Sequence, residues 1–354
     1  MFQESTPLYA SSNDKRSVCV ACYVFGSYEV FIPFYIYSVL KSYPNYSCYV
    51  FVDDPLSHNV LQALEIIEAE ISNNFKIIEL NSDDLPTSTE VLSKSKYPHA
   101  KPALRWFINE NYFQGFDYVY IGDIDFFIVP EKPALSQQHI DSMKLTGLPF
   151  SNAVRKEDRL TGLHFFETDI YFSKIKSHCY FYDSAKLETE FDEFDKVGVD
   201  ERVLYKILDE SFNENIREKL TNFRPYHGFH LAALRSPLSL LKEDTRHGSK
   251  KAKNSHNTYN RNTLLKAVKS LYIDDPIFWK IKKVNSHISV SRLAILAKPK
   301  LRYYQKLFPI YIKECLVEVI NKVRKNLTNA SQKTDLSICS ISTTIKVSVI
   351  NVSK

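Results

Sequence analysis

The amino-acid sequence predicts an α/β fold in which a mostly parallel central sheet is flanked by helices and followed by a basic helical extension. Short apolar, β-branched runs alternate with helical patterns through the first half of the chain, as in parallel-sheet proteins. The run over residues 118–130 is apolar at nearly every position, which is typical of a strand buried on both faces. With 354 residues, 44% of them hydrophobic, the chain is long enough for one large domain and an appendage.

The predicted strands and helices alternate from residue 17 onward. A strand that ends in a Gly or Asp-Pro turn is followed by apolar residues at helical spacing, and this repetition favours right-handed crossovers between parallel strands. We expect strands over residues 17–24, 47–53, 76–80, 118–130 and 162–166, and helices over 28–43, 59–70, 101–111 and from about 200.

The expected organisation is a tail over residues 1–16, the main α/β domain over 17–240, a basic helical region over 241–330 and a second tail over 331–354. The first tail is polar and lacks the apolar core of a signal peptide. No segment offers the roughly 18 apolar residues of a membrane span, and the six cysteines are scattered rather than spaced as a disulfide framework. We therefore expect a cytoplasmic protein.

Two carboxylates, Asp123 and Asp125, interrupt the apolar run over residues 118–130. An ionised carboxylate inside a covered strand is costly unless a cation or hydrogen bonds compensate it. We therefore expect both residues at the C-terminal edge of the strand, where open α/β sheets bind ligands. Two hard oxygen donors suit Mn²⁺ or Mg²⁺, whose remaining ligands are commonly waters and substrate phosphates. The alternative is a pair of aspartates that caps loop amides.

Lys101 and Arg105 lie in the predicted helix immediately before this run, and their spacing of i and i+4 places them on one helical face. A lysine and a fork-shaped guanidinium beside a bound cation favour the anchoring of phosphate or carboxylate groups. The alternative is a solvated charged face.

Two further motifs carry polar chemistry later in the chain. Asp200 and Glu201 fall in the first turn of a predicted helix, where acids either serve catalysis or simply favour the helix dipole. His227 and His230 flank Gly228 in a predicted loop, where they either ligate a cation, reach phosphate oxygens or serve as ordinary loop histidines.

The order of these motifs resembles that of glycosyltransferases of the GT-A fold, over roughly residues 17–235. The arrangement looks most like retaining families such as the glycogenin-type and blood-group-type transferases. Asp200 and Glu201, with Leu204 three residues on, fall between the Asp-Gln pair of the first family and the Asp-Glu-x-x-x-Leu motif of the second. His227-Gly228 departs from the His-x-x-Gly loop of the glycogenin type.

The resemblance implies a metal-dependent transferase that moves a sugar from a nucleoside-diphosphate sugar with retention of configuration. The expected donor is a UDP-sugar. The implied acceptor is a glycan or a lipid-linked oligosaccharide, as in bacterial polysaccharide assembly. Asp123, Asp125 and His227 would hold Mn²⁺ or Mg²⁺, and Glu201 or Asp200 would face the anomeric carbon. The implied donor-binding residues are Tyr23, Val24, Tyr28, Lys101, Arg105, Asp123, Ile124 and His230. Gly162 and His164 would meet the acceptor, although His164 is equally explained as a core histidine.

Two other functions remain open from the sequence. One is a sugar-nucleotide-binding or carbohydrate-binding protein without turnover. The other is a nucleotidyltransferase, although the turn after the first strand lacks the Gly-rich, Arg-containing phosphate loop that such enzymes show. Hydrolase motifs such as Gly-x-Ser-x-Gly or His-Glu-x-x-His do not occur in the sequence.

The region over residues 246–325 carries nineteen Lys and Arg residues against four acids. Between residues 301 and 323, aromatic and aliphatic residues are interleaved with the bases, which predicts an amphipathic helix with a cationic rim. We expect this surface to bind an anionic membrane on its inner face rather than nucleic acid. The alternative is a set of basic helices that pack on the catalytic domain with their charges solvated.

Overall fold

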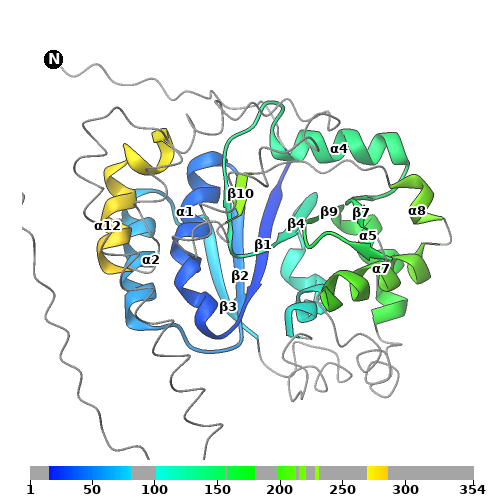
Figure 1. Cartoon of the computed structure of the whole chain (residues 1–354), viewed down its shortest axis with the longest axis horizontal. Coiled ribbons are helices and arrows are strands. Elements are labelled where there is room, and N and C mark those ends of the chain that lie inside the picture. Colours follow the sequence, from blue (N-terminus) through cyan, green and yellow to red (C-terminus); the bar gives the residue numbers. More distant parts are fainter. Residues whose placement is uncertain are drawn as a thin grey trace, which may run out of the picture.

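The computed structural model describes residues 16–80, 101–155, 158–179, 198–212, 215–220, 228–230 and 269–285. Its centre is a six-stranded sheet with the strand order β3-β2-β1-β4-β9-β6. Helices lie on both sides of this sheet (Figure 1). Strands β3, β2, β1 and β4 run parallel to one another, β9 is antiparallel to β4, and β6 is antiparallel to β9. The predicted α/β fold with a mostly parallel sheet is therefore confirmed.

The strands of the central sheet are β1 (Val18–Val24), β2 (Ser47–Val52), β3 (Phe75–Glu79), β4 (Tyr118–Gly122), β6 (Phe150–Ser151) and β9 (His164–Glu167). Two small antiparallel sheets accompany it: β5 (Phe126–Ile128) with β10 (Gly228–His230), and β7 (Val154–Arg155) with β8 (Arg159–Leu160). The α-helices are α1 (Ile32–Ser42), α2 (His58–Glu70), α4 (Leu135–Thr146), α5 (Thr168–Cys179), α7 (Val199–Ser211), α8 (Ile216–Lys219) and α12 (Pro276–Val284). Shorter turns are the 3-10 helices η1 (Gly26–Phe31), η4 (Lys101–Phe107) and η5 (Glu110–Phe113), and the π-helical η7 (Lys269–Ile273).

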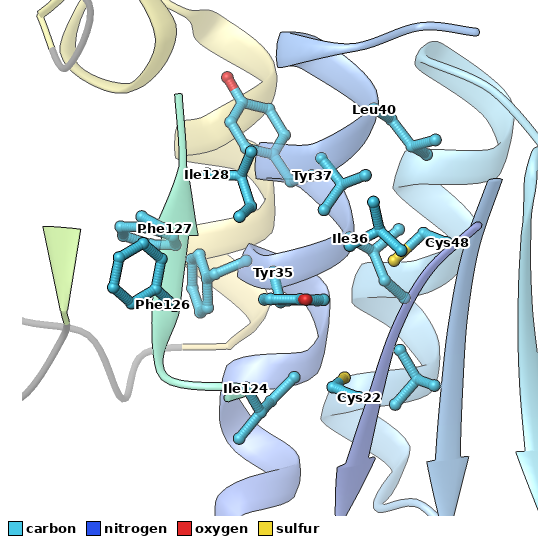
Figure 2. Close-up of a cluster of buried hydrophobic side chains, with 14 of the residues drawn as sticks. Cys22, Tyr35, Ile36, Tyr37, Leu40, Cys48, Ile124, Phe126, Phe127 and Ile128 are labelled. Carbon is cyan, nitrogen blue, oxygen red and sulfur yellow. The ribbon is translucent and has the colours of Figure 1, made fainter. Parts of the chain in front are cut away.

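Strand β1 is buried along its whole length because both faces of the sheet are covered. Its alternate residues point to opposite sides. Val20 and Cys22 belong to a core shared with α1, α2 and α12, whereas Cys19 and Ala21 belong to a second core shared with η4, α5 and α7. Figure 2 shows the first of these cores, with α1 side chains lying between the sheet and β5. The continuous apolar composition of β1 follows from this double coverage.

Three predicted elements differ from the structure. The helix expected over residues 28–43 is a 3-10 turn followed by α1, which has a proline in its first turn. The helix expected over 101–111 is split into η4 and η5, because Asn109 lies between them and accepts a hydrogen bond from the Asn111 amide at 2.9 Å. The single strand expected over 118–130 ends at Gly122, and the chain turns at Ile124 before β5 joins a different sheet.

The described part of the basic region, residues 269–285, packs on the hydrophobic core beside the central sheet. Phe278 and Ile281 of α12 are fully buried against α1 and α2. Two hydrogen bonds add to this packing. The Tyr272 hydroxyl donates to the Ile128 carbonyl at 2.9 Å, and the side-chain nitrogen of Asn285 donates to the Val30 carbonyl at 2.9 Å. For residues 269–285 the structure thus shows the second expectation, a basic segment that packs on the main domain. Residues 301–323, the expected amphipathic helix, lie outside the described residues, as do residues 1–15.

No helix within the described ranges is both long enough and apolar enough to cross a membrane.

Removal of the Phe278 ring should reveal how much α12 contributes to the core. Phe278→Ala leaves a cavity in a fully buried aromatic cluster, so we expect the free energy of unfolding to fall by about 3–5 kcal/mol, measured by chemical denaturation. Lys280→Ala is the matched control on the same helix, because it removes only an exposed ion pair with Glu70 and should cost about 1 kcal/mol or less. Equal losses in the two variants would contradict the packing of α12 described above.

Candidate active site

The candidate site lies at the C-terminal edge of three neighbouring parallel strands. The registers pair Val24 of β1 with Val52 of β2, and Cys22 of β1 with Gly122 of β4. Phe25, Asp53 and Asp123 directly follow these strands and therefore share one edge of the sheet. Open α/β sheets bind ligands at this edge.

A buried arginine connects this edge to helix α7. The Arg105 side chain is almost entirely buried, and its Nη1 donates to Asp123 Oδ1 at 2.5 Å. Its Nη2 pairs with a carboxylate oxygen of Asp200 in the first turn of α7. Burial by itself lowers the pKa of Arg105, but Asp123 and Asp200 outweigh that effect and raise it. The guanidinium therefore stays charged and holds the two carboxylates on either side of it.

The Arg105–Asp200 pair has a second layer of support from Trp106. The Trp106 indole nitrogen donates to the Asp200 carbonyl at 2.9 Å. The Arg105 guanidinium also lies 4.5 Å from the Trp106 ring centroid, a cation–π distance. Both the main chain and the side chain of Asp200 are thus engaged by η4.

Gly162 has no side chain, and the Arg105–Asp123 ion pair occupies the space that a side chain would fill. A Cβ atom at this position would lie 2.6 Å from Arg105 Nη2 and 3.1 Å from Asp123 Oδ1. Any side chain there would push the guanidinium or the carboxylate away. The structure thus gives Gly162 a packing reason beside Asp123, and its predicted contact with an acceptor stays a prediction.

Lys101 and Arg105 do not share a face, because η4 is a 3-10 helix in which residues four apart differ by about 120° in direction. The shared face expected from α-helical spacing is therefore wrong. The Lys101 ammonium pairs with the Asp53 carboxylate and lies 5.6 Å from the Phe25 ring centroid. Arg105 is directed instead toward Asp123 and Asp200, as described above. Phosphate anchoring by either residue stays a prediction.

Aromatic residues surround the Lys101–Asp53 pair at the end of β1. The Tyr23 hydroxyl donates to Asp53 Oδ2 at 3.4 Å, and burial together with Asp53 raises the pKa of Tyr23. The Phe25 ring centroid lies 5.7 Å from that of Tyr23 and 5.9 Å from that of Tyr28. Asp53 Oδ1 is buried and has no hydrogen-bond partner within the described ranges. Phe25 and Asp53 were not predicted as site residues, although their positions just after two strands were a usable signal.

Glu201 lies beside Asp200 but has different partners. Its side chain is buried, and its Oε1 accepts from Arg155 Nη1 at 2.7 Å while its Oε2 lies 3.9 Å from Arg159 Nη1. Burial raises the pKa of Glu201, Arg155 opposes that shift, and Asp200 adds to it. Asp200 and Glu201 therefore make tertiary ion pairs, which simple helix capping does not require. Arg155 and Arg159 were not predicted as site residues, because they lie more than 40 residues before Glu201 and gave no local signal.

His164 lies in the core rather than on the surface of the site. It is fully buried, its Nδ1 lies 3.2 Å from the Asn152 side-chain nitrogen, and its ring meets Trp106 edge-on at 6.0 Å. Burial, followed by the charge of Arg105, lowers the pKa of His164 to about 3, so the ring is neutral. The structure thus supports the core alternative for His164 and gives no support to its predicted contact with an acceptor.

The Asp123 and Asp125 carboxylates flank the turn between β4 and β5. The Asp123 side chain keeps 36% of its surface exposed despite its bond to Arg105, whereas Asp125 is buried and Ile124 between them is also buried. Among the described residues, no group of three or more His, Cys, Asp or Glu side chains is arranged to hold a metal. Two oxygen donors still fit Mn²⁺ or Mg²⁺, since these ions commonly keep waters and bind substrate phosphates.

Two histidines, His227 and His230, were predicted to assist this site. His227 lies outside the described residues. His230 ends β10, whose backbone register places it opposite Phe126, the residue that follows Asp125. The chain segment of His230 is therefore brought beside the Asp-x-Asp turn, while ligation by either histidine stays a prediction.

Comparison with known proteins gives structural similarity only. No family model and no curated protein sequence matches the chain. It is similar to the galactosyltransferase LgtC in complex with donor and acceptor sugar analogues, with 12% identity over 59% of this chain and 84% of that one, at a TM-score of 0.34. It is also similar to the glycosyltransferase GlyE of Streptococcus pneumoniae, with 13% identity over 65% and 49% and a TM-score of 0.37. A third is the Mn/GDP form of core-mannan synthase A from Aspergillus fumigatus, with 9% identity over 58% and 73% and a TM-score of 0.36.

All three similar structures are glycosyltransferases. At these identities and TM-scores, the functional assignment of this chain rests on the geometry of its own residues.

Replacement of Arg105 should be strongly destabilising. Arg105→Met leaves Asp123 and Asp200 as uncompensated, partly buried charges, so we expect a loss of about 3–5 kcal/mol in the free energy of unfolding. Arg217→Met is the matched control, because Arg217 also pairs with an aspartate, Asp158 at 2.6 Å, but at an exposed position. That control should cost about 1 kcal/mol or less by the same denaturation measurement. A small loss for both variants would show that Arg105 does not hold the site together.

Proposed function

We propose that the protein is a glycosyltransferase that moves a sugar from a nucleoside-diphosphate sugar to a glycan or lipid-linked oligosaccharide. The observation that carries this proposal is the buried Arg105, which joins the sheet-edge carboxylate Asp123 to the helix carboxylate Asp200. Asp123 belongs to the expected cation-binding pair and Asp200 to the second carboxylate pair, so this contact supports a site that uses both pairs. Charge separation between a diphosphate leaving group and an anomeric carbon needs stabilisation at both of these places.

Donor binding is assigned to the strand edge. Asp123 and Asp125, with His227, would hold Mn²⁺ or Mg²⁺, and such an ion supplies neutralisation of charge on a diphosphate. Lys101 lies on the same edge and would add a second positive charge near the phosphates. The rings of Tyr23, Phe25 and Tyr28 suit stacking on a nucleobase such as uracil, and the buried Asp53 Oδ1 suits a hydroxyl or amide donor from the nucleoside. Val24, Ile124 and His230 complete the donor-side assignment made from the sequence.

Glu201 is the better of the two helix carboxylates for contact with the anomeric carbon. The Asp200 side chain is bonded to Arg105 and its carbonyl to Trp106, so Asp200 serves to position the site. The Oε2 atom of Glu201 has no hydrogen-bond partner within the described ranges. Its charge would stabilise an oxocarbenium-like centre or attack it as a nucleophile, which favours transfer with retention.

A binding protein without turnover is the second candidate function. It would share the donor-side contacts but would not need a cation that opposes the effect of burial on a carboxyl group. We favour the enzyme because Arg155 pairs with Glu201 and opposes the rise in the pKa of this carboxyl that burial causes.

Membrane docking is proposed only for the basic residues beyond 285, since 269–285 pack on the core. Each Lys or Arg near an anionic surface contributes about 1 kcal/mol, so a handful suffices for binding that salt weakens. Truncation after Asn285 keeps α12 and removes the proposed docking surface. Cosedimentation with anionic but not neutral vesicles, lost on this truncation and reduced by salt, is the expected result. Binding that does not depend on lipid charge would contradict this proposal.

A donor screen tests the proposed activity directly. With Mn²⁺ present, the purified protein should release nucleoside diphosphate from one nucleotide sugar, with UDP-sugars the first choice. EDTA and the Asp123→Asn and Asp125→Asn variants should each abolish the release, because the diphosphate charge is then not neutralised. Circular dichroism of the variants checks that the fold is kept. Unchanged release after EDTA and in both variants would refute metal dependence, and no release from any donor would favour the binding protein.

Glu201→Gln tests the assignment of the anomeric residue. We expect kcat to fall by about 100-fold or more, with the KM for donor largely kept, because an interaction specific to the transition state is lost. Asp200→Asn is the comparison, and its main effect should be a lower melting temperature because Arg105 loses a charged partner. Retained turnover in Glu201→Gln, or a product of inverted anomeric configuration by NMR, would refute the retaining role of Glu201.

A further inference from the structure

We infer that the β7–β8 hairpin holds the Glu201 carboxylate in its working position, with Arg155 and Arg159 as positioning residues. The inference rests on the proposed glycosyltransferase function and adds two residues to it. Neither arginine needs to touch the substrate for this role, because both act through Glu201.

The hairpin is too small to be stable without outside contacts. Each of its strands has two residues, and an isolated two-stranded hairpin is marginal even when it is longer. Arg155 and Arg159 are moreover direct partners across the two strands. Like charges in that position destabilise a strand pair, so the hairpin needs a negative charge beside it.

A buried polar network anchors the base of the hairpin. Asn152 Oδ1 accepts from the Thr161 amide at 3.0 Å and from the Thr161 hydroxyl at 2.7 Å. The Asn152 side-chain nitrogen donates to the Thr161 carbonyl at 3.1 Å and faces His164 Nδ1 at 3.2 Å. All three residues are buried, so this network fixes where the two strands leave the core.

Glu201 supplies the negative charge that the two arginines need. Its Oε1 lies 2.7 Å from Arg155 and its Oε2 lies 3.9 Å from Arg159, so each carboxylate oxygen faces one guanidinium. Gly198, directly before α7, allows this approach in two ways. Its φ of 92° is a left-handed conformation suited to glycine, and a Cβ there would lie 2.6 Å from Arg159 Nη1.

The groups around Glu201 show which effects on its pKa the two arginines oppose. The charged groups that face it are Arg155 from β7, Arg159 from β8, Asp200 on its own helix, Asp123 after β4 and Arg105 from η4. Burial and the two aspartates favour the protonated form, while Arg155 and Arg159 favour the charged form. A protonated Glu201 would neither stabilise a positive anomeric centre nor attack it.

Three variants separate positioning from mere packing. Arg155→Gln should lower kcat about ten-fold or more while the KM for donor changes little, and Arg155→Lys should restore part of the rate. Arg159→Gln should have a smaller effect, since its distance to Glu201 is longer. Arg217→Gln is the control, because Arg217 contacts Asp158 between β7 and β8 but not Glu201, and it should leave kcat unchanged.

The pH dependence of kcat is a measurement that a purely structural role of Arg155 would not change. Removal of the Arg155 charge raises the pKa of Glu201, so the required charged form is present only above a higher pH. In Arg155→Gln the acid limb of kcat should therefore move upward by about one pH unit, and Arg155→Lys should move it back.

A double-mutant cycle completes the test. If Arg155 acts through Glu201, Arg155→Gln should have almost no further effect on the residual rate of Glu201→Gln. An equal loss in both backgrounds, or a rate loss without a shift of the acid limb, overturns the inference while the transferase function stands. Absence of turnover in the native protein with every donor overturns the proposed function and the inference together.

Discussion

The buried charge of Arg105 is the constraint on which the rest of the site depends. A guanidinium with almost no exposed surface is tolerable only when carboxylates face it, and here one comes from the end of β4 and the other from the start of α7. Such a pair adds little net stability compared with apolar packing, but it allows few alternative arrangements. Gly162 is required because Arg105 fills the space of its missing side chain. One ion-pair network thus fixes the distance between the two halves of the site.

This constraint divides the work between two adjacent carboxylates. Asp200 is committed to Arg105 and Trp106, whereas the neighbouring Glu201 pairs with Arg155. Glu201 then needs its own cations, and these come from a hairpin anchored separately through Asn152 and Thr161. The two networks meet at the first turn of α7 and again at His164, whose ring faces both the Asn152 side chain and the Trp106 ring. Charges of opposite sign therefore alternate from Asp123 through Arg105 and Asp200, and again from Glu201 to its two arginines, which limits the electrostatic cost of burying them together.

The sequence was most informative where the signal was local. The apolar composition of β1 and the burial cost of Asp123 and Asp125 correctly indicated a covered sheet with the aspartates beyond the end of a strand. The prediction that Lys101 and Arg105 share a face was wrong because η4 is a 3-10 helix, in which Lys101 pairs with Asp53 and Arg105 with Asp123. Helical spacing in the sequence does not distinguish α from 3-10 geometry. The pairing of Glu201 with Arg155 was not predictable, because long-range ion pairs leave no periodicity in the sequence.

The segment over residues 269–285 shows that part of the basic region also belongs to the core. Its positive charge suggested a surface element, yet Phe278 and Ile281, three residues apart on α12, form an apolar stripe that the core requires. Its lysines stay at the rim, as Lys280 does in its pair with Glu70. The same segment reaches the site indirectly, because Tyr272 donates to the Ile128 carbonyl and stacks on Phe127 in the strand that follows Asp125. Basic character and a role in the core are thus compatible, since the two properties belong to different faces of one helix.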